Sequence, residues 1–193
     1  MLDRFIRNLL HRLVRKSEET LAVESEHMHF IIDTSIGAFV DLLFFMKLAT
    51  HRQKIPSDAL HLARIVATQD VDCGTCVQFN VNLALREGMR PDWIKATLDH
   101  RPEALPLELQ EVYQFTDHIL RHTYQEDELR EAIRARYGDR GLLDLAYGIA
   151  SAQVMPLTKQ ALGFAKSCSK VEVKVKDAPR ATRWDNHLSS SPA

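Results

Sequence analysis

Apolar residues recur at helical spacing in one segment after another of this 193-residue chain. Such a repeat predicts amphipathic helices that each bury one face. The chain has only seven glycines and seven prolines, which disfavours an all-β fold built on many tight turns. An apolar share of 45% is enough for a globular core. The sequence therefore predicts an all-α fold.

Capping residues, prolines and glycines mark where these helices begin and end. Ser35 offers an N-cap, Pro56 opens a helix, and Gly88 and Gly138 each end one. Pro156 should kink or break the last helix. Residues 17–26 form a polar connector or a short helix. The predicted helices run over residues 1–16, 36–51, 57–68, 73–87, 91–98, 107–123, 126–137 and 140–164.

Three regions of the chain follow from this pattern. Residues 1–26 form an amphipathic helix and its connector, residues 27–166 the helical domain, and residues 167–193 a polar tail. In the tail, Val171, Val173 and Val175 alternate with charged residues, as in an exposed strand. Within the domain, residues 36–48 are apolar on nearly all sides, which predicts a buried helix at a subunit interface.

The first helix, residues 1–16, has an apolar face and an arginine-rich face. We expect its apolar face to pack on the domain or on a second subunit. Peripheral contact with an anionic membrane is the weaker alternative, and such a basic helix permits it. Arginines interrupt any apolar core of a signal peptide, and the apolar run over residues 36–48 is too short to span a bilayer.

Charge and cysteine content exclude several classes of protein. A formal net charge of -1 argues against a nucleic-acid partner. Three cysteines are too few and too scattered for a secreted disulfide scaffold. We therefore expect a reducing, cytoplasmic compartment, and no motif calls for a cofactor.

Two of the cysteines, Cys73 and Cys76, form a C-x-x-C motif where a helix is predicted to begin. Asp72 is a suitable N-cap for that helix. The partial positive charge of a helix N-terminus favours a thiolate, so one cysteine can act as a nucleophile near neutral pH. The spacing also lets the second thiol resolve an oxidised intermediate as a disulfide.

Two other interpretations of the cysteine pair remain open. A structural zinc site needs about two further ligands, and the sequence offers only scattered histidines, namely His61, His100, His118 and His122. The pair could also be buried and inert, since a free cysteine often serves as a small core residue. The polar neighbours Asp72 and Thr75 argue against a purely apolar site.

The chain resembles the alkylhydroperoxidase D / carboxymuconolactone decarboxylase family over roughly residues 28–164. The resemblance rests on Leu-His-Leu-Ala-Arg-Ile-Val at 60–66, Cys-Gly-Thr-Cys at 73–76, and two later segments at 128–139 and 142–145. It implies an alkylhydroperoxidase D-like helical domain that assembles as a homo-oligomer, either a trimer or a hexamer. It also implies a thiol-dependent peroxidase that takes a hydroperoxide or disulfide substrate and that a disulfide-reductase partner recharges.

By that resemblance, Cys76 becomes the sulfenic acid, and Cys73 is its proton donor and resolving thiol. The family's peroxidases carry a glutamate twelve residues before the first cysteine and a histidine four residues after the second. Here these positions are His61 and Asn80. Histidine can move a proton, whereas asparagine only forms hydrogen bonds. We therefore expect an altered proton relay and weak peroxidase activity.

Two further functions are compatible with the same sequence. The chain could be a non-enzymatic oligomeric module that senses redox state or binds a partner. It could also be a decarboxylase-like enzyme acting on a small cyclic acid, whose activity would not need the cysteines. Serine variants of Cys73 and Cys76 separate the thiol enzyme from the decarboxylase.

Overall fold

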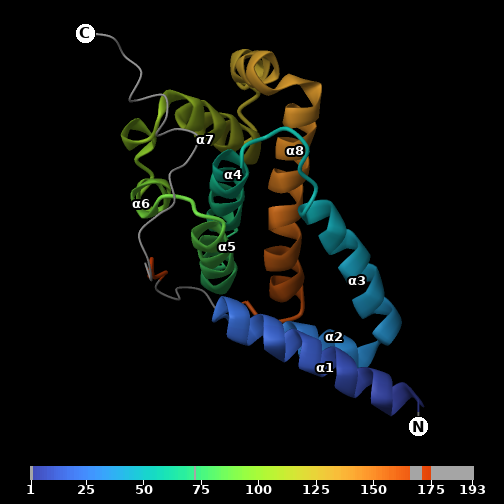
Figure 1. Cartoon of the computed structure of the whole chain (residues 1–193). Helices are drawn as coiled ribbons and strands as arrows, with labels where there is room; N and C mark the ends of the chain where they lie inside the picture. The colour runs from blue at the N-terminus through green and yellow to red at the C-terminus, as the bar shows by residue number, and fades with distance from the viewer. Residues whose placement is uncertain (1, 72, 166–170, 175–193) are drawn as a thin grey trace.

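The computed structural model describes residues 2–71, 73–165 and 171–174 of the chain, and every regular element within them is a helix (Figure 1). This confirms the predicted all-α class. The helices are α1 (Leu2–Leu21), α2 (Glu26–Thr34), α3 (Ile36–Ala49), α4 (Ser57–Asp70), α5 (Gly74–Arg86), α6 (Pro91–Leu98), α7 (Leu107–Leu120) and α8 (Asp127–Ala161), with a 3-10 turn, η1 (Pro102–Ala104), before α7.

Helix α4 is the centre of the main core. Every residue from Asp58 to Thr68 on this helix is buried, because α4 packs against α5, α6, α7 and α8. The loop before α4 is tied to α8 by Asp144, whose Oδ2 accepts the backbone N–H groups of Gln53, Lys54 and Ile55 at 2.8, 2.7 and 3.1 Å. This fully buried carboxylate fixes where α4 begins relative to α8.

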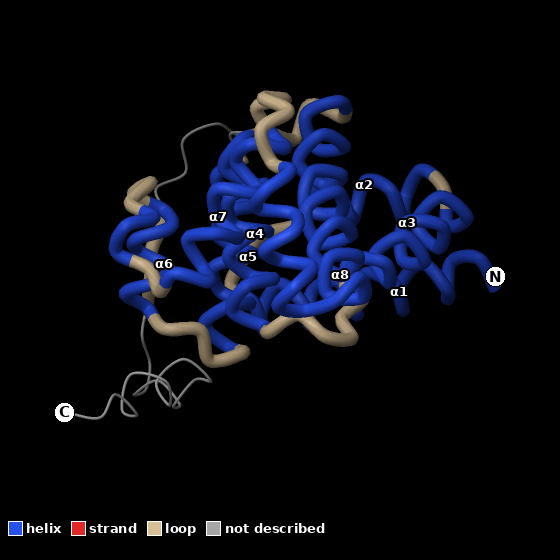
Figure 2. Tube along the Cα trace, turned by 90° about the horizontal axis from the view of Figure 1, so that it is seen from above, coloured by secondary structure: helices blue, strands red, loops and turns tan. Residues whose placement is uncertain are grey.

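The first three helices form a smaller cluster on the other side of α8 (Figure 2). Val14 of α1, Ile32 of α2 and Phe39 of α3 are its buried residues. Helix α3 also packs against α8, and the C-terminal end of α1 reaches α5. The N-terminal helices therefore lie against the same bundle that holds the cysteine pair.

The start and end of α5 follow from its sequence. Gly88 adopts a left-handed φ of 91°, and the N–H of Met89 donates to the carbonyl of Ala84 at 3.0 Å. This is the hydrogen-bond pattern of a Schellman motif, which a glycine at C′ favours. The predicted end of the thiol helix at Gly88 is confirmed.

Two N-terminal features differ from the prediction. Helix α1 continues to Leu21, so part of the predicted connector is helical. Helix α2 was not predicted as a helix of its own, because its apolar residues Phe30, Ile31 and Ile32 are consecutive and form no helical stripe. The other predicted helices are present, with ends that move by up to three residues, except that those predicted over residues 126–137 and 140–164 form one element, α8, which is kinked at Gly138.

The predicted break at Pro156 is wrong. Helix α8 continues through Pro156 to Ala161, and its non-helical residue is Gly138, with φ 71° and ψ 176°. A proline in a helix costs about 3 kcal/mol through its lost N–H and its clash with the preceding turn. Both Pro156 and Lys159 are buried in this part of α8, so packing offsets that cost.

Other predictions concern the exposed parts of the chain. In α3 only Phe39 is buried within this single chain, and Val40, Leu43, Phe44 and Leu48 are exposed. Residues 171–174 form no strand, although Val171 and Val173 are partly buried while Glu172 and Lys174 are exposed, and Val175 lies outside the described residues. None of the described helices combines the length and the apolar character that crossing a membrane requires.

Candidate functional site

The two thiols lie at the first turn of α5, as the sequence predicted. Cys73 is the N-cap and Cys76 is in the first turn. Their Sγ atoms are 2.9 Å apart and both cysteines are free. A disulfide bond of about 2.05 Å needs the sulfurs to approach by less than about 1 Å. Cys73 is 1% exposed and Cys76 is 9% exposed, so the pair is already positioned to close beneath the surface.

The N-cap is one residue later than predicted. The carbonyl of Cys73 accepts the N–H groups of Cys76 and Val77 at 2.8 and 3.0 Å, which makes Cys73 the N-cap. The prediction that Asp72 caps this helix is therefore wrong, and Asp72 itself lies outside the described residues. Both sulfurs consequently lie at the positive end of the helix dipole, which stabilises a thiolate.

A buried lysine from α8 reaches the pair through Thr75. Lys159 is 5% exposed, and its Nζ donates a hydrogen bond to Thr75 Oγ1. An ammonium group can only donate, so Thr75 Oγ1 is the acceptor and keeps its own hydrogen. That hydroxyl lies 3.6 Å from Cys73 Sγ. The hydrogen of the Thr75 hydroxyl is therefore free to be donated to the sulfur of Cys73 when that sulfur is a thiolate.

The pKa shifts of the two cysteines agree with a hydrogen bond from Thr75 to the sulfur of Cys73. Hydrogen bonding by Cys76, followed by the hydroxyl of Thr75 and the charge of Lys159, outweighs burial and lowers the pKa of Cys73 to about 5. The hydrogen bond with Cys73, and then burial, raise the pKa of Cys76. The two directions favour Cys73 as the thiolate and Cys76 as the thiol of the pair.

A buried histidine of α2 lies near the same lysine. Burial, and then the positive charge of Lys159, lower the pKa of His27 to about 4. No hydrogen-bond partner for its Nδ1 is found among the described residues. His27 is therefore neutral at neutral pH, and it adds no second positive charge beside Lys159.

The structure does not bring His61 into hydrogen-bond contact with a thiol. His61 lies on α4 at 1% exposure, and its Nε2 is 3.1 Å from Glu87 Oε2 at the far end of α5. Its Nδ1 has no partner among the described residues. The hydrogen bond to His61 lowers the pKa of Glu87, so His61 Nε2 is engaged by a carboxylate and not by a sulfur.

Asn80 also makes a structural contact. Its side-chain Nδ2 donates to the backbone carbonyl of Cys76 at 3.0 Å. The amide therefore supports the backbone one turn below the thiols, and among the described contacts it does not reach a sulfur. Of the four predicted site residues, Cys73 and Cys76 lie in contact with each other. Asn80 contacts only the backbone of Cys76 among the described contacts, and His61 contacts Glu87.

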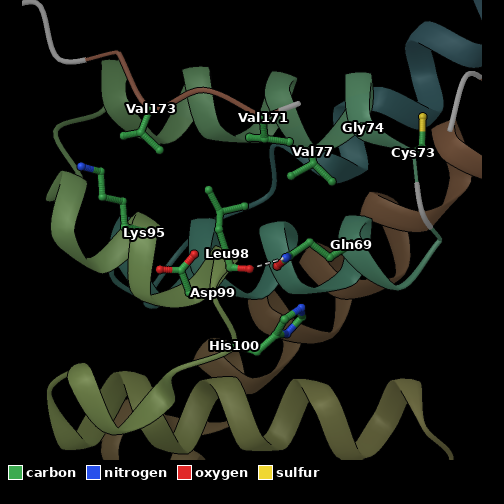
Figure 3. Close-up of a pocket in the computed structure, with 10 residues that line it drawn as sticks. All are labelled: Gln69, Cys73, Gly74, Val77, Lys95, Leu98, Asp99, His100, Val171 and Val173. Atoms are coloured by element: carbon green, nitrogen blue, oxygen red, sulfur yellow. Dashed lines mark hydrogen bonds between the residues drawn. The ribbon is translucent and has the colours of Figure 1, made fainter. Parts of the chain in front are cut away.

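A cavity of about 570 Å³ begins at Cys73 and extends between α5 and α6 (Figure 3). Cys73 lies at one end of it and Lys95 at the other, with Val77 between them. Val171 and Val173 form part of its wall, and the amide of Gln69 donates to the carbonyl of Leu98 at 3.1 Å. Asp99 and His100 complete a mixed polar and apolar lining.

Sequence reasoning missed Lys159 and His27 and treated Thr75 only as a polar neighbour. Charged residues are rarely buried unless paired, and nothing local marks Lys159 as an exception. Its position relative to the thiols depends on how α8 packs on α5. Lys159 and Thr75 are 84 residues apart in the chain. No periodic pattern in the sequence relates two residues at that separation.

A metal ion has no ready site in the part of the chain that the structure describes. No three side chains of the histidine, cysteine, aspartate and glutamate types lie together there as ligands. Cys168 lies outside the described residues. The cysteine pair as described thus lacks the further ligands that a structural zinc would need.

Comparisons of this chain with protein-family models, with curated proteins and with solved structures found no match.

Proposed function

We propose that this chain is a thiol-dependent oxidoreductase that reduces a hydroperoxide or a disulfide with Cys73 and Cys76. The observation that carries the proposal is the Sγ–Sγ distance of 2.9 Å at a helix N-terminus. Buried Lys159 adds a positive charge through Thr75, on the side of Cys73. An activated thiol beside a second thiol is the arrangement that reversible two-electron chemistry needs.

Cys73 is the nucleophile in this proposal. Its thiolate attacks the terminal oxygen of a hydroperoxide, the O–O bond breaks, and the sulfur keeps that oxygen as a sulfenic acid. Cys76 gives its proton to the departing alkoxide, which leaves as an alcohol. The Cys76 thiolate then attacks the Cys73 sulfur, the S–S bond forms as the S–O bond breaks, and the leaving hydroxide takes a proton from solvent to become water. An external dithiol restores both thiols.

These roles are the reverse of those that the family resemblance implies. The resemblance makes Cys76 the sulfenic acid, whereas the hydrogen-bond donors and the lowered pKa favour Cys73 as the thiolate. The proton relay would also differ, with Thr75 and Lys159 in place of His61. The peroxidase activity would be weak, because no described general base touches either sulfur.

The test is to treat the reduced protein with cumene hydroperoxide and to follow each cysteine by peptide mass. We expect Cys73 and Cys76 to be lost together as one disulfide. In Cys76→Ser, a sulfenic acid that dimedone traps should form at Cys73, whereas Cys73→Ser should form none at Cys76. If both thiols stay reduced while a control thiol peroxidase reacts, the proposed function is wrong.

A homo-oligomer is the assembly that we propose for this protein, as a trimer or a hexamer. Exposed apolar side chains support it on both α1 and α3, namely Phe5, Leu9, Leu13, Val40, Leu43, Phe44 and Leu48. Large apolar side chains exposed in such number on neighbouring helices commonly mark a protein interface. The oxidoreductase would then need a disulfide-reductase partner to recharge it.

A further inference from the structure

Arg64 of α4 is a buried arginine whose side chain lies against α8. A Cβ added at Gly148 of α8 would be 3.9 Å from Arg64 Nε, and Arg64 is only 8% exposed. No hydrogen bond or ion pair of its guanidinium group is found among the residues that the structure describes. Buried charges are normally paired, so Arg64 lacks the counter-charge that its burial requires.

The carboxylate that acts on Arg64, that of Glu87, is engaged by another residue. Glu87 Oε2 lies 3.1 Å from His61 Nε2, and the side chain of Glu87 is 43% exposed. Burial lowers the pKa of Arg64, and the charge of Glu87 opposes this effect only in part. Glu87 therefore does not pair with the guanidinium group of Arg64.

Asp144 is a second carboxylate of this region, one helical turn before Gly148 on α8, and it is also engaged. Its Oδ2 accepts three backbone N–H groups of the loop before α4. Its Oδ1 lies 3.5 Å from His51 Nε2. These contacts hold the loop on α8, and they leave Arg64 without a carboxylate partner in the described chain.

Arg52, in the loop before α4, brings a second positive charge to this region. It is exposed, and its charge acts on both Arg64 and Glu87. No ion pair of Arg52 is found within the described parts of the chain. One negative charge, on Glu87, and one positive charge, on Arg52, thus act on the cation of Arg64, which leaves an excess of positive charge around it.

The nitrogens of Arg64 are accessible to a small ligand. Among the described residues, the enclosed polar atoms without a partner include His61 Nδ1 but no nitrogen of Arg64. A nitrogen that has no partner and is not enclosed is in contact with solvent. The planar guanidinium group presents N–H donors that match two oxygens of a carboxylate or a phosphate. Its shape and charge therefore fit an oxyanion.

We propose that Arg64 and Arg52 bind a small oxyanion, of the phosphate or carboxylate type, where α4 meets α8 and the loop that precedes α4. Arg64 donates two hydrogen bonds to the anion, and Arg52 supplies a second positive charge from the solvent side. Glu87, at the end of α5, is about 16 Å from Cys76 along the helix axis, at a rise of about 1.5 Å per residue. The site is thus separate from the thiols and does not depend on the proposed function.

Isothermal titration calorimetry on the reduced full chain tests the proposal. Sodium phosphate and sodium acetate are titrated separately at neutral pH, with sodium chloride keeping the ionic strength constant. We expect saturable binding at one site per chain for at least one of the two anions. Binding of phosphate alone would assign the site to phosphate groups, and binding of acetate alone would assign it to carboxylates.

Arg64→Met removes the charge and keeps much of the side-chain volume. This variant should bind the anion about tenfold or more weakly, since hydrogen bonds between charged groups are lost. Without the anion, its Tm should equal or exceed that of wild type, because an unpaired buried charge is removed. Arg15→Met is the matched control, since Arg15 is an exposed arginine of α1, and it should bind the anion as wild type does.

Arg64→Lys replaces the methionine variant if thermal melting shows that the latter is unfolded. Lysine keeps the charge but cannot form the bidentate contact, so this variant should also bind more weakly. The proposal is wrong if neither anion binds to wild type, or if a folded Arg64 variant binds as tightly as wild type. It is also wrong if Arg64→Met lowers the Tm and dissociates an oligomer, because Arg64 would then pair with a carboxylate of a second copy of this chain.

Discussion

Thr75 lies between the buried ammonium group of Lys159 and the sulfur of Cys73, and it connects the two by hydrogen bonds. Because Lys159 can only donate, its bond to Thr75 Oγ1 leaves the threonine hydrogen directed at Cys73 Sγ. A hydrogen bond to a charged group contributes about 1.5–3 kcal/mol. The same bond favours the thiolate over the thiol, so it lowers the pKa of Cys73.

Replacing Thr75 by valine should therefore raise the pKa of Cys73. In wild type, the rate of Cys73 alkylation should be constant from pH 7 to 9 and fall to half near pH 5, where the thiolate is protonated. Thr75→Val removes a donor to the charged form, and the midpoint should rise by about one to two pH units. Peptide mass analysis separates Cys73 from the other cysteines.

Thr75→Ser is the matched control for that measurement, since serine keeps the hydroxyl. Its pH profile should equal that of wild type. Identical midpoints for the valine and serine variants would mean that Thr75 does not transmit the charge of Lys159.

Helix α8 changes direction at a single residue. Gly138 takes a left-handed φ of 71°, a conformation that most L-residues adopt only at a cost. The change brings residue 141 close to the preceding turn, so a Cβ at Gly141 would lie 2.3 Å from Tyr137 Cβ. This contact explains why the element needs a second glycine three residues after the first.

Gly141→Ala should lower the free energy of unfolding by about 1–3 kcal/mol, the cost of overpacking a buried position. Urea denaturation followed by circular dichroism measures it. Gly37→Ala is the control, because Gly37 is an exposed position of α3 with only an ordinary contact to Ser35. That variant should be more stable by about 0.5–1 kcal/mol through helix propensity, and a similar gain in Gly141→Ala would contradict the packing argument.

At the scale of the whole molecule, the small N-terminal cluster and the main core have different surfaces. Helices α1 and α3 bury only Val14 and Phe39 in their shared cluster, and they leave a set of large apolar side chains in contact with solvent. Exposed apolar area of this kind is stabilised when another surface covers it. This is why we attribute the assembly to these helices.

Phe44→Glu should therefore dissociate the proposed homo-oligomer. Phe44 is 72% exposed within the single chain, so the substitution should not unfold it, while a buried glutamate at an interface is costly. Sedimentation velocity should show a smaller particle. Leu107→Glu, at a leucine of α7 that is 64% exposed, should leave the assembly unchanged, and an unaltered particle for Phe44→Glu would exclude α3 from the interface.

The sequence alone determined the features that depend on neighbours along the chain. Helical spacing predicted an all-α protein, Gly88 predicted where α5 ends, and the C-x-x-C spacing predicted two thiols in one helical turn. Each of these follows from local backbone geometry and capping. The errors at Asp72 and at α2 are also local: the first misplaces a helix start by one residue, and the second misses a short helix whose apolar residues are consecutive.

Only the tertiary structure decided what surrounds the thiols. Lys159 and His27 come from helices distant in sequence, and His61 pairs with Glu87. Glu172 reaches Gln78 across 94 residues. Such contacts depend on how helices pack, and helix packing is set by the summed burial of many side chains. No short sequence motif encodes the summed burial of many side chains. The sequence therefore predicted the cysteine pair but not the groups that lower the pKa of Cys73.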